Sequence, residues 1–180
     1  MASVVLKMSM SLDGFVEPAH DDPEWNFAGR SPDSGEWLLD TLSNAGAHLV
    51  GAETYKGWAG FWPRQPGPIA AAMNDIPKVV FSNSLTSADW QETTIATGDL
   101  AEAVTRLKQE RSGGYLLAQA GVRFARSLVA TGLIDEYRLV VHPIVFGSGE
   151  RLFTTPLAVE PMSTTAFSGG IVAHVFAARR

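Results

Sequence analysis

Two glycine turns, each placed between an apolar run and a helix-like segment, constrain the fold of this chain most strongly. Gly51 follows the apolar segment His48–Val50. Gly121 follows Tyr115–Ala118 and leads into the helical pattern of Val122–Thr131. A strand, a small-residue turn and a helix start together leave backbone N–H groups unpaired, and a phosphate can bind there. Two such turns about 70 residues apart predict one long anionic ligand, such as a dinucleotide, bound across two strand ends of one sheet.

Composition excludes several classes of protein. The 180 residues fit one domain spanning 1–180, and 46% hydrophobic with 18% charged residues is ordinary for a globular protein. No apolar run is long enough for a membrane helix, and no basic segment precedes one as in a secretory signal. The net charge of −5 argues against nucleic acid as a partner. The chain has no cysteine and its four histidines are scattered, so we expect no disulfide, no metal site and a cytoplasmic location.

Apolar patterning predicts alternating strands and helices. The predicted strands are Val4–Met10, His48–Val50, Lys78–Ser82, Thr94–Ala96, Tyr115–Ala118, Tyr137–Val141, Met162–Phe167 and Ile171–Ala177. The predicted helices are Gly35–Asn44, capped by Asp33 or Ser34, Thr54–Trp58, Ile69–Asp75, Leu100–Glu110 and Val122–Thr131. This order predicts an α/β fold in three layers, with a mainly parallel central sheet and an antiparallel C-terminal hairpin.

A long loop over residues 15–35 interrupts this alternation. Loops of this length in a compact domain are often lids or binding loops. The aromatic residues Phe15, Trp25 and Phe27 favour that interpretation, although hydrophobic plugs under loops are also common. Both readings stay open at this point.

Several short motifs occur in a characteristic order along the chain. They are Ser11–Gly14, Gly51-x-x-Thr54-Tyr55, Val80–Ser82, Ala120–Gly121, Gly132–Glu136 and Pro143–Gly149 leading to Leu152–Phe153. With these motifs the chain resembles the dihydrofolate reductase-like superfamily, and within it the reductase domain of bacterial riboflavin biosynthesis and its stand-alone relatives. The resemblance covers nearly the whole chain and implies the dihydrofolate reductase-like fold.

The resemblance implies a nicotinamide cofactor, NADPH or NADH, bound where the strand order of the sheet reverses. It places the cofactor phosphates at the two glycine turns and the adenosine ribose beside the turn after Phe81. The cofactor-binding residues that it implies are Gly51, Ala52, Thr54, Tyr55, Ser82, Asn83, Ser84, Ala120, Gly121, Val122, Arg123 and Phe124.

Three positions depart from the family pattern. Ala52 and Asn83 stand where the family usually has arginines that grip the cofactor phosphates, so we expect only a weak preference for NADPH over NADH. Ala120 stands where the first of two glycines is usual. The glycine pair is often joined by a cis peptide in this fold, and alanine at the first position keeps a negative φ accessible.

Reduction also needs a proton source and a substrate pocket. Asp33, Glu36 or Asp40 near the first helix, or Glu150 on the other side, are candidate catalytic acids. Asp33 is also explained as a helix cap, and Glu150 as a solvated loop residue. The candidate substrate-binding residues are Asp13, Gly14, Trp25 and Gly147, with Trp58, Phe61 and Trp62 as further aromatic candidates.

The resemblance therefore implies a nicotinamide-dependent reductase of a pyrimidine- or pterin-like heterocycle. The specific expectation is 5-amino-6-(5-phosphoribosylamino)uracil reductase-type chemistry, as in riboflavin biosynthesis, with hydride delivered to the ribosyl C1′. Dihydrofolate reduction and a non-catalytic nucleotide-binding protein are the alternatives. The apolar residues of Leu139–Val141 and of the C-terminal hairpin (Phe167, Ile171, Val172 and Val175) exceed what one sheet face needs, which predicts a homodimer.

Overall fold

The computed structural model describes residues 1–20, 22 and 24–179. Its strands are β1 (Val4–Met10), β2 (Phe15–Pro18), β3 (Ala45–Gly51), β4 (Lys78–Phe81), β5 (Thr93–Ala96), β6 (Tyr115–Gln119), β7 (Glu136–Val141), β8 (Gly149–Arg151), β9 (Val159–Ala166) and β10 (Val172–Ala178). Its α-helices are α1 (Pro32–Ser43), α2 (Ala52–Phe61), α3 (Pro68–Asp75), α4 (Leu100–Glu110) and α5 (Val122–Ala130). Short 3₁₀ helices span Trp25–Phe27 and Trp62–Arg64.

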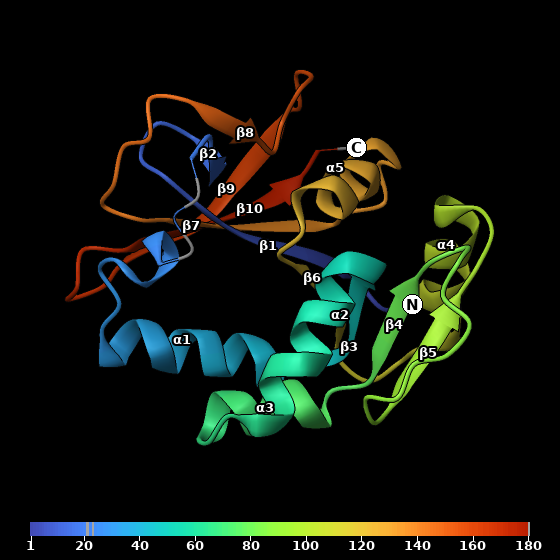
Figure 1. Ribbon diagram of the computed structural model, residues 1–180. Helices are drawn as coiled ribbons and strands as arrows, with labels where there is room; N and C mark the ends of the chain where they lie inside the picture. The colour runs from blue at the N-terminus through green and yellow to red at the C-terminus, as the bar shows by residue number, and fades with distance from the viewer. Residues whose placement is uncertain (21, 23, 180) are drawn as a thin grey trace.

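One large sheet organises the molecule (Figure 1), with strand order β5-β4-β3-β6-β1-β7-β10-β9. The pairs from β5 to β7 are parallel, whereas β10 pairs antiparallel with both β7 and β9. A second small sheet pairs β2 with β8 antiparallel. The predicted mainly parallel sheet with an antiparallel C-terminal hairpin is thereby confirmed.

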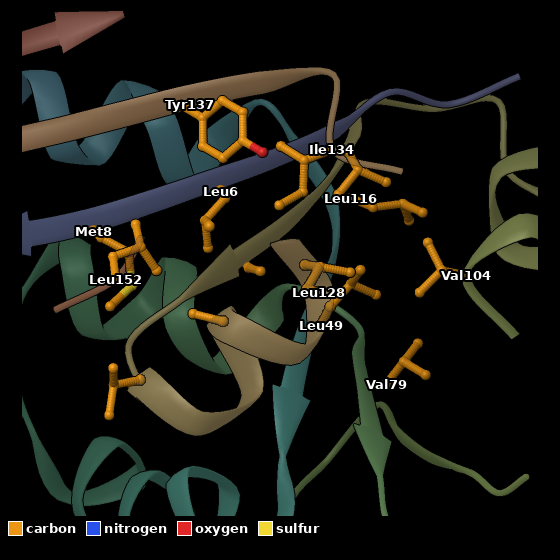
Figure 2. Close-up of a cluster of buried hydrophobic side chains, with 14 of the residues drawn as sticks. Leu6, Met8, Leu49, Val79, Val104, Leu116, Leu128, Ile134, Tyr137 and Leu152 are labelled. Carbon is orange, nitrogen blue, oxygen red and sulfur yellow. The ribbon is translucent and has the colours of Figure 1, made fainter. Parts of the chain in front are cut away.

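Side chains on the two faces of the sheet form separate cores. On the face covered by α4 and α5, alternate strand residues such as Leu6, Leu49 and Leu116 meet Val104 and Leu128 of the helices (Figure 2). On the opposite face, a second cluster joins the sheet to α1, α2 and α3. Helices on both faces explain why the parallel strands are almost continuously apolar.

The central strand β1 carries an exception to this apolar pattern. Val4, Leu6 and Met8 point into the core under α4 and α5. Val5 begins the opposite row, and Lys7 and Ser9 continue it, because side chains alternate along a strand. Lys7 and Ser9 are half-buried, so the face toward α1 is polar at this end of the strand.

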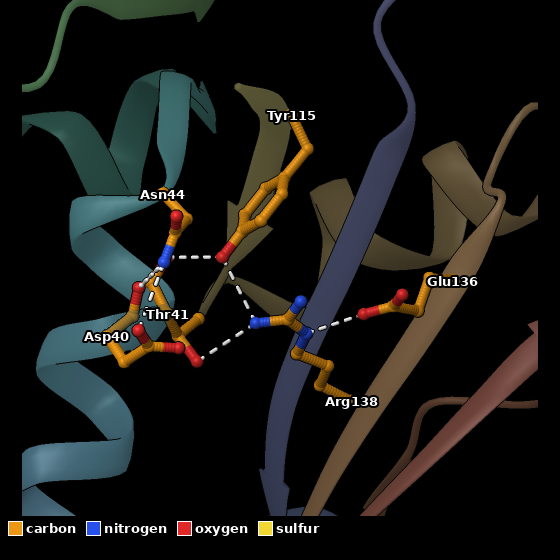
Figure 3. A network of polar contacts seen from close by, with 6 residues as sticks. All are labelled: Asp40, Thr41, Asn44, Tyr115, Glu136 and Arg138. Carbon is orange, nitrogen blue, oxygen red and sulfur yellow. Dashed lines mark hydrogen bonds and ion pairs between the residues drawn. The ribbon is translucent and has the colours of Figure 1, made fainter. Parts of the chain in front are cut away.

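A polar network holds α1 against the sheet. Arg138 of β7 donates to Thr41 Oγ1 and to the Tyr115 hydroxyl, each at 3.0 Å, and pairs with Glu136 at 2.6 Å (Figure 3). The Tyr115 hydroxyl in turn donates to the Thr41 carbonyl. These contacts join α1, β6 and β7 and fix the position of α1 over the polar end of β1.

The structure corrects several predicted boundaries. The predicted helix from Gly35 begins at Pro32, and its N-cap is Ser31 rather than Asp33 or Ser34. Helix α2 spans Ala52–Phe61 and is longer at both ends than the predicted helix Thr54–Trp58. The predicted loop over residues 15–35 contains β2, which pairs with the unpredicted β8.

Two of the apolar hairpin residues that predicted the homodimer are buried within the chain. Phe167 and Ile171 are buried in a third small core with Val140 and Ala173, beside Trp37 of α1. These two side chains are therefore occupied within the chain and do not contribute an outer apolar face.

No helix among the described residues combines the length and the apolar composition needed to cross a membrane. The same residues contain no group of three or more histidine, aspartate or glutamate side chains placed to hold a metal ion.

Candidate active site

The two glycine turns meet at the carboxyl ends of β3 and β6, which are neighbours in the sheet. Helix α2 begins directly after Gly51, and α5 begins directly after Gly121. Among the described residues, no side chain caps either helix and none accepts the first backbone N–H groups of α2 or α5, which are therefore available to a ligand. The turns pack closely, because a Cβ added at Gly121 would lie 2.4 Å from Oγ1 of Thr54.

A cleft of about 570 Å³ runs along these two turns. Its lining residues are Glu17, Gly51, Ala52, Glu53, Thr54, Gly121, Val122, Arg123 and Phe124. The structure thus brings together most of the residues expected to bind the cofactor. Arg123 is the one cation among these lining residues, which leaves backbone N–H groups as the main attraction for an anion.

Other expected cofactor residues have local structural roles. Tyr55 is buried, and its hydroxyl accepts the backbone N–H of Trp90 at 3.1 Å. After β4, Asn83 Oδ1 accepts the N–H of Gly98 at 3.0 Å, and Ser82 Oγ accepts those of Ser84 and Leu85. Tyr55, Ser82, Asn83 and Ser84 are not among the residues that line the cleft.

The Ala120–Gly121 turn adopts a left-handed backbone at both residues, with φ of 64° at Ala120 and 73° at Gly121. The expectation that Ala120 keeps a negative φ is wrong. The described part of the chain contains no cis peptide bond, so the implied cis linkage is absent from this turn. Ala120 therefore holds a conformation that glycine adopts at lower cost.

A second cavity of about 410 Å³ continues from the first, and both are lined by Glu17, Gly121 and Val122. Its floor is polar, formed by Lys7 and Ser9 of β1 and Gln119 of β6. Its walls combine polar side chains from Glu17, Asn26 and Arg30 with apolar ones, which include Trp25, Leu38, Trp58, Trp62, Ile69 and Met73. A polar floor between aromatic walls suits a planar heterocycle whose edge makes hydrogen bonds.

Lys7 is the principal titratable group of this floor. Burial lowers the pKa of its ammonium to about 8, and the charge of Arg30 contributes in the same direction. Within the described residues, no hydrogen bond or ion pair occupies the Lys7 ammonium. A cation with a pKa near 8 and free N–H groups can bind an anionic substrate group or donate a proton.

A smaller cavity of about 80 Å³ adjoins the second one beneath the start of α1. Arg30, Ser31, Ser34, Trp37 and His142 are among its lining residues. His142 Nδ1 donates to the carbonyl of Ala28 at 2.9 Å, and burial, with the charges of Lys7 and Arg30, lowers the pKa of the imidazole. His142 is therefore neutral near pH 7 and holds the residues before α1 against β7.

The acids predicted for catalysis lie elsewhere. Asp33 accepts the backbone N–H and hydroxyl of Ser168, each at 2.9 Å, and hydrogen bonds, first of all from Ser31, lower its pKa to about 2. Glu150 pairs with Arg126 at 2.7 Å. Neither residue lines the three cavities, and neither do Glu36 and Asp40 of α1. The acid that lines both larger cavities is Glu17 of β2, which sequence reasoning did not single out.

Of the predicted substrate residues, Trp25 lines the second cavity. Asp13 instead connects two loops, accepting the N–H groups of Phe146 at 3.1 Å and Gly147 at 2.7 Å. The Ser11 hydroxyl and these N–H groups lower the pKa of Asp13 to about 2. Asp13, Gly14 and Gly147 are absent from the three cavity linings and fix the segments that flank the site.

Comparison with known families agrees with this architecture. A family model described as the RibD C-terminal domain matches residues 2–173. The chain belongs to this family. Among curated proteins, the uncharacterized protein YyaP of Bacillus subtilis (strain 168) is 27% identical over 181 residues, which cover 96% of this chain and 93% of YyaP.

Solved structures support the fold. A putative riboflavin biosynthesis protein from Shewanella sp. PV-4 superposes with a TM-score of 0.77 at 19% identity, covering 99% of each chain. Dihydrofolate reductase from Enterococcus faecalis, complexed with NADP(H), gives 0.63 at 11% identity and covers 99% of this chain and 97% of that one. A deaminase/5-amino-6-(5-phosphoribosylamino)uracil reductase from Thermotoga maritima gives 0.70 at 16% identity, covering 99% of this chain and 57% of that one. The expected dihydrofolate reductase-like fold is confirmed, and the family is reductase-like.

We expect Ala120→Gly to stabilise the protein, because it relieves the left-handed backbone at a residue with a Cβ. The free energy of unfolding should rise by roughly 0.5–1 kcal/mol, the difference between the left-handed penalty and the entropy that glycine loses. Ala71→Gly in α3 is the matched control and should lower the free energy of unfolding by about 1 kcal/mol. Urea unfolding monitored by circular dichroism measures both, and a destabilised Ala120→Gly would contradict the expectation.

Proposed function

We propose that this protein is a cytoplasmic, nicotinamide-dependent reductase of a pyrimidine-type heterocycle, with 5-amino-6-(5-phosphoribosylamino)uracil reductase-type chemistry. The observation that carries the proposal is the continuity of the cleft along the two glycine turns with the cavity floored by Lys7, Ser9 and Gln119. A dinucleotide site joined to a polar pocket is the arrangement that hydride transfer between two ligands requires.

The residues at the glycine turns fit a nicotinamide dinucleotide. Free N–H groups at the starts of α2 and α5 suit its pyrophosphate, with Thr54 and Arg123 as further donors. When bound, the nicotinamide supplies the hydride. NADPH and NADH should both be accepted, because Ala52 and the hydrogen-bonded Asn83 offer no charge to a 2′-phosphate.

On the substrate side, the indole rings of Trp25, Trp58 and Trp62 pack around the heterocycle and exclude water. Lys7 Nζ holds a proton at the floor, where a reduced substrate needs one. Arg30, which lines the same cavity, supplies positive charge for a substrate phosphate.

Dihydrofolate reduction receives less support. In folate reductases a carboxyl group on the first helix reaches the pocket, whereas the α1 residues that line the second cavity are Leu38 and Leu42. A non-catalytic nucleotide-binding protein is the outcome if ligands bind without turnover.

We also propose that the protein is a homodimer. Tyr137, Leu139, Phe153, Leu157, Val159 and Phe176 line an apolar groove of about 280 Å³. The groove lies beside β9, an edge strand with mostly exposed side chains. A second copy would cover both the apolar groove and the open edge.

The first prediction from the proposed function concerns Lys7 and pH. Because the protonated ammonium is the active form, kcat/KM for the phosphoribosylaminouracil substrate at saturating NADH should fall as the pH rises through about 8. Lys7→Arg keeps the charge without titrating in this range, so its profile should lack this decline. Lys7→Met should lower kcat/KM at every pH. The same decline near pH 8 in Lys7→Arg would assign it to another group.

The second prediction concerns cofactor choice. Titrations that follow tryptophan fluorescence should give dissociation constants for NADPH and NADH within about tenfold of one another, or ~1.4 kcal/mol. Asn83→Arg adds a charged donor for the 2′-phosphate and should shift the preference toward NADPH by about tenfold or more. Asn83→Gln is the control for losing the bond to Gly98. A hundredfold NADPH preference in the wild type would point to another base, with Arg123→Ala as the test.

The third prediction concerns assembly. Sedimentation velocity at micromolar concentration should show a dimer, and Leu157→Asp should produce a monomer because a carboxylate in the groove opposes burial. Leu12→Asp is the control, since Leu12 is 69% exposed and lies outside the groove. A wild type that sediments only as a monomer would refute the proposed homodimer.

A further inference from the structure

In the substrate cavity, the residues around the Gln119 carboxamide define which hydrogen bonds this group can make with a ligand. Gln119 lies on β6 with Lys7 of β1 as its direct partner in the parallel pairing. Its side-chain nitrogen Nε2 lies 3.3 Å from His48 Nε2 and 3.5 Å from Met73 Sδ. A thioether sulfur accepts hydrogen bonds and cannot donate them, so the Met73 contact favours the NH₂ group pointing inward.

His48 reinforces this orientation from the neighbouring strand. It is 1% exposed on β3, and its ring packs against the indole of Trp58 with centroids 5.6 Å apart. Burial, with the charge of Lys78 as a second cause, lowers its pKa to about 3. The imidazole is therefore neutral, and with Nε2 accepting from Gln119 its proton resides on Nδ1.

With both N–H groups of the carboxamide directed inward, its carbonyl oxygen is the group left for the cavity. Gln119 Oε1 has no hydrogen-bond partner within the described residues. It is also not one of the fully buried polar atoms that lack a partner, so this oxygen keeps some contact with solvent. Gln119 itself lines the cavity. The floor thus presents an acceptor, Oε1, on the strand next to a donor, Lys7 Nζ.

A donor and an acceptor on adjacent strands complement a substrate edge that carries the reverse pair. The lactam edge of a pyrimidinedione, H–N–C=O, offers its N–H to Gln119 and its carbonyl to Lys7. A protonated amidine edge, such as that of a ring-protonated 2,4-diaminopyrimidine, instead carries only donors and a positive charge, and the Lys7 ammonium has no lone pair to accept them. The floor residues Lys7, Ser9 and Gln119 include no carboxylate to bind such an edge, and the acid of this cavity, Glu17, lies on β2 rather than on the strands that carry Lys7 and Gln119.

We propose that Gln119 is a specificity-determining residue that selects a lactam edge over a protonated amidine edge, and that His48 is the positioning residue that keeps its carbonyl toward the cavity. This inference rests on the proposed function, because it assigns the chemistry of the same cavity.

The test compares two probes of matched shape, 5,6-diaminouracil and 2,4,5,6-tetraaminopyrimidine, by isothermal titration calorimetry without any nicotinamide, at a mildly acidic pH at which the tetraamine is ring-protonated and the uracil is neutral. The wild type should bind the uracil at least tenfold more tightly. Gln119→Glu provides a carboxylate for the amino edge and should shift the ratio by tenfold or more toward the tetraamine. Gln119→Leu, which provides an apolar side chain of similar size without an acceptor, should weaken the uracil about tenfold without strengthening the tetraamine.

The role of His48 is tested by His48→Phe, which keeps a ring against Trp58 and removes the acceptor. The uracil should bind severalfold more weakly while the affinity for the tetraamine stays the same or rises. A merely structural role would weaken both probes equally, and thermal melting verifies that the variant is folded.

Equal binding of the two probes to the wild type, or no binding of either at millimolar concentration, would overturn the inference. The outcome is separable from that of the proposed function. Lactam selectivity without NADH or NADPH binding would contradict the reductase and leave this inference intact, whereas cofactor binding without selectivity would do the opposite.

Discussion

The parallel pairing of β1 with β6 is the constraint on which the candidate site depends. This register places Lys7 directly beside Gln119 and sets the Ala120–Gly121 turn at the end of the same strand. Since side chains alternate along a strand, the register that buries Leu6 and Met8 under α4 and α5 necessarily turns Lys7 and Ser9 toward α1. A slip of one residue would bury the ammonium and expose the apolar row. The hydrophobic core and the polar floor are therefore specified by the same pairing.

Local sequence patterns predicted the strands and helices that carry a strong periodic signal. The apolar strands and the amphipathic helices α4 and α5 were found near their observed positions. The prediction failed where a partner distant in sequence decides the structure. Strand β2 forms because it pairs with β8, about 130 residues away, and neither segment alone has a distinctive pattern. Helix α1 begins at Pro32 because Ser31 and Ser34 exchange hydrogen bonds at its start, a reciprocal contact that the isolated residue types do not specify.

The same distinction applies to the site. The glycine turns could be predicted because a small residue between a strand and a helix indicates a tight turn with free backbone N–H groups at the helix start. The roles of Lys7 and Gln119 could not be predicted from the neighbouring sequence, because each is simply a polar residue in an apolar strand. Only the pairing of β1 with β6 makes them neighbours. By residue type and position in the sequence, Asp33 is a candidate catalytic acid and Asn83 a candidate cofactor-binding residue. Their oxygen atoms instead accept hydrogen bonds from Ser168 and Gly98 across loop junctions that only the folded chain creates.

Charge is distributed unevenly along the continuous cleft, and this distribution bears on how the proposed reductase would recognise its ligands. The lining of the glycine-turn cleft includes Glu17 and Glu53 against one cation, Arg123. The substrate cavity contains Lys7 and Arg30 with Glu17 as its acid. Backbone N–H groups at helix starts bind a pyrophosphate whatever the side chains are, but they do not distinguish one dinucleotide from another. Discrimination in this chain therefore falls mainly to the substrate cavity, where a desolvated ammonium and an oriented carboxamide impose a specific order of donor and acceptor.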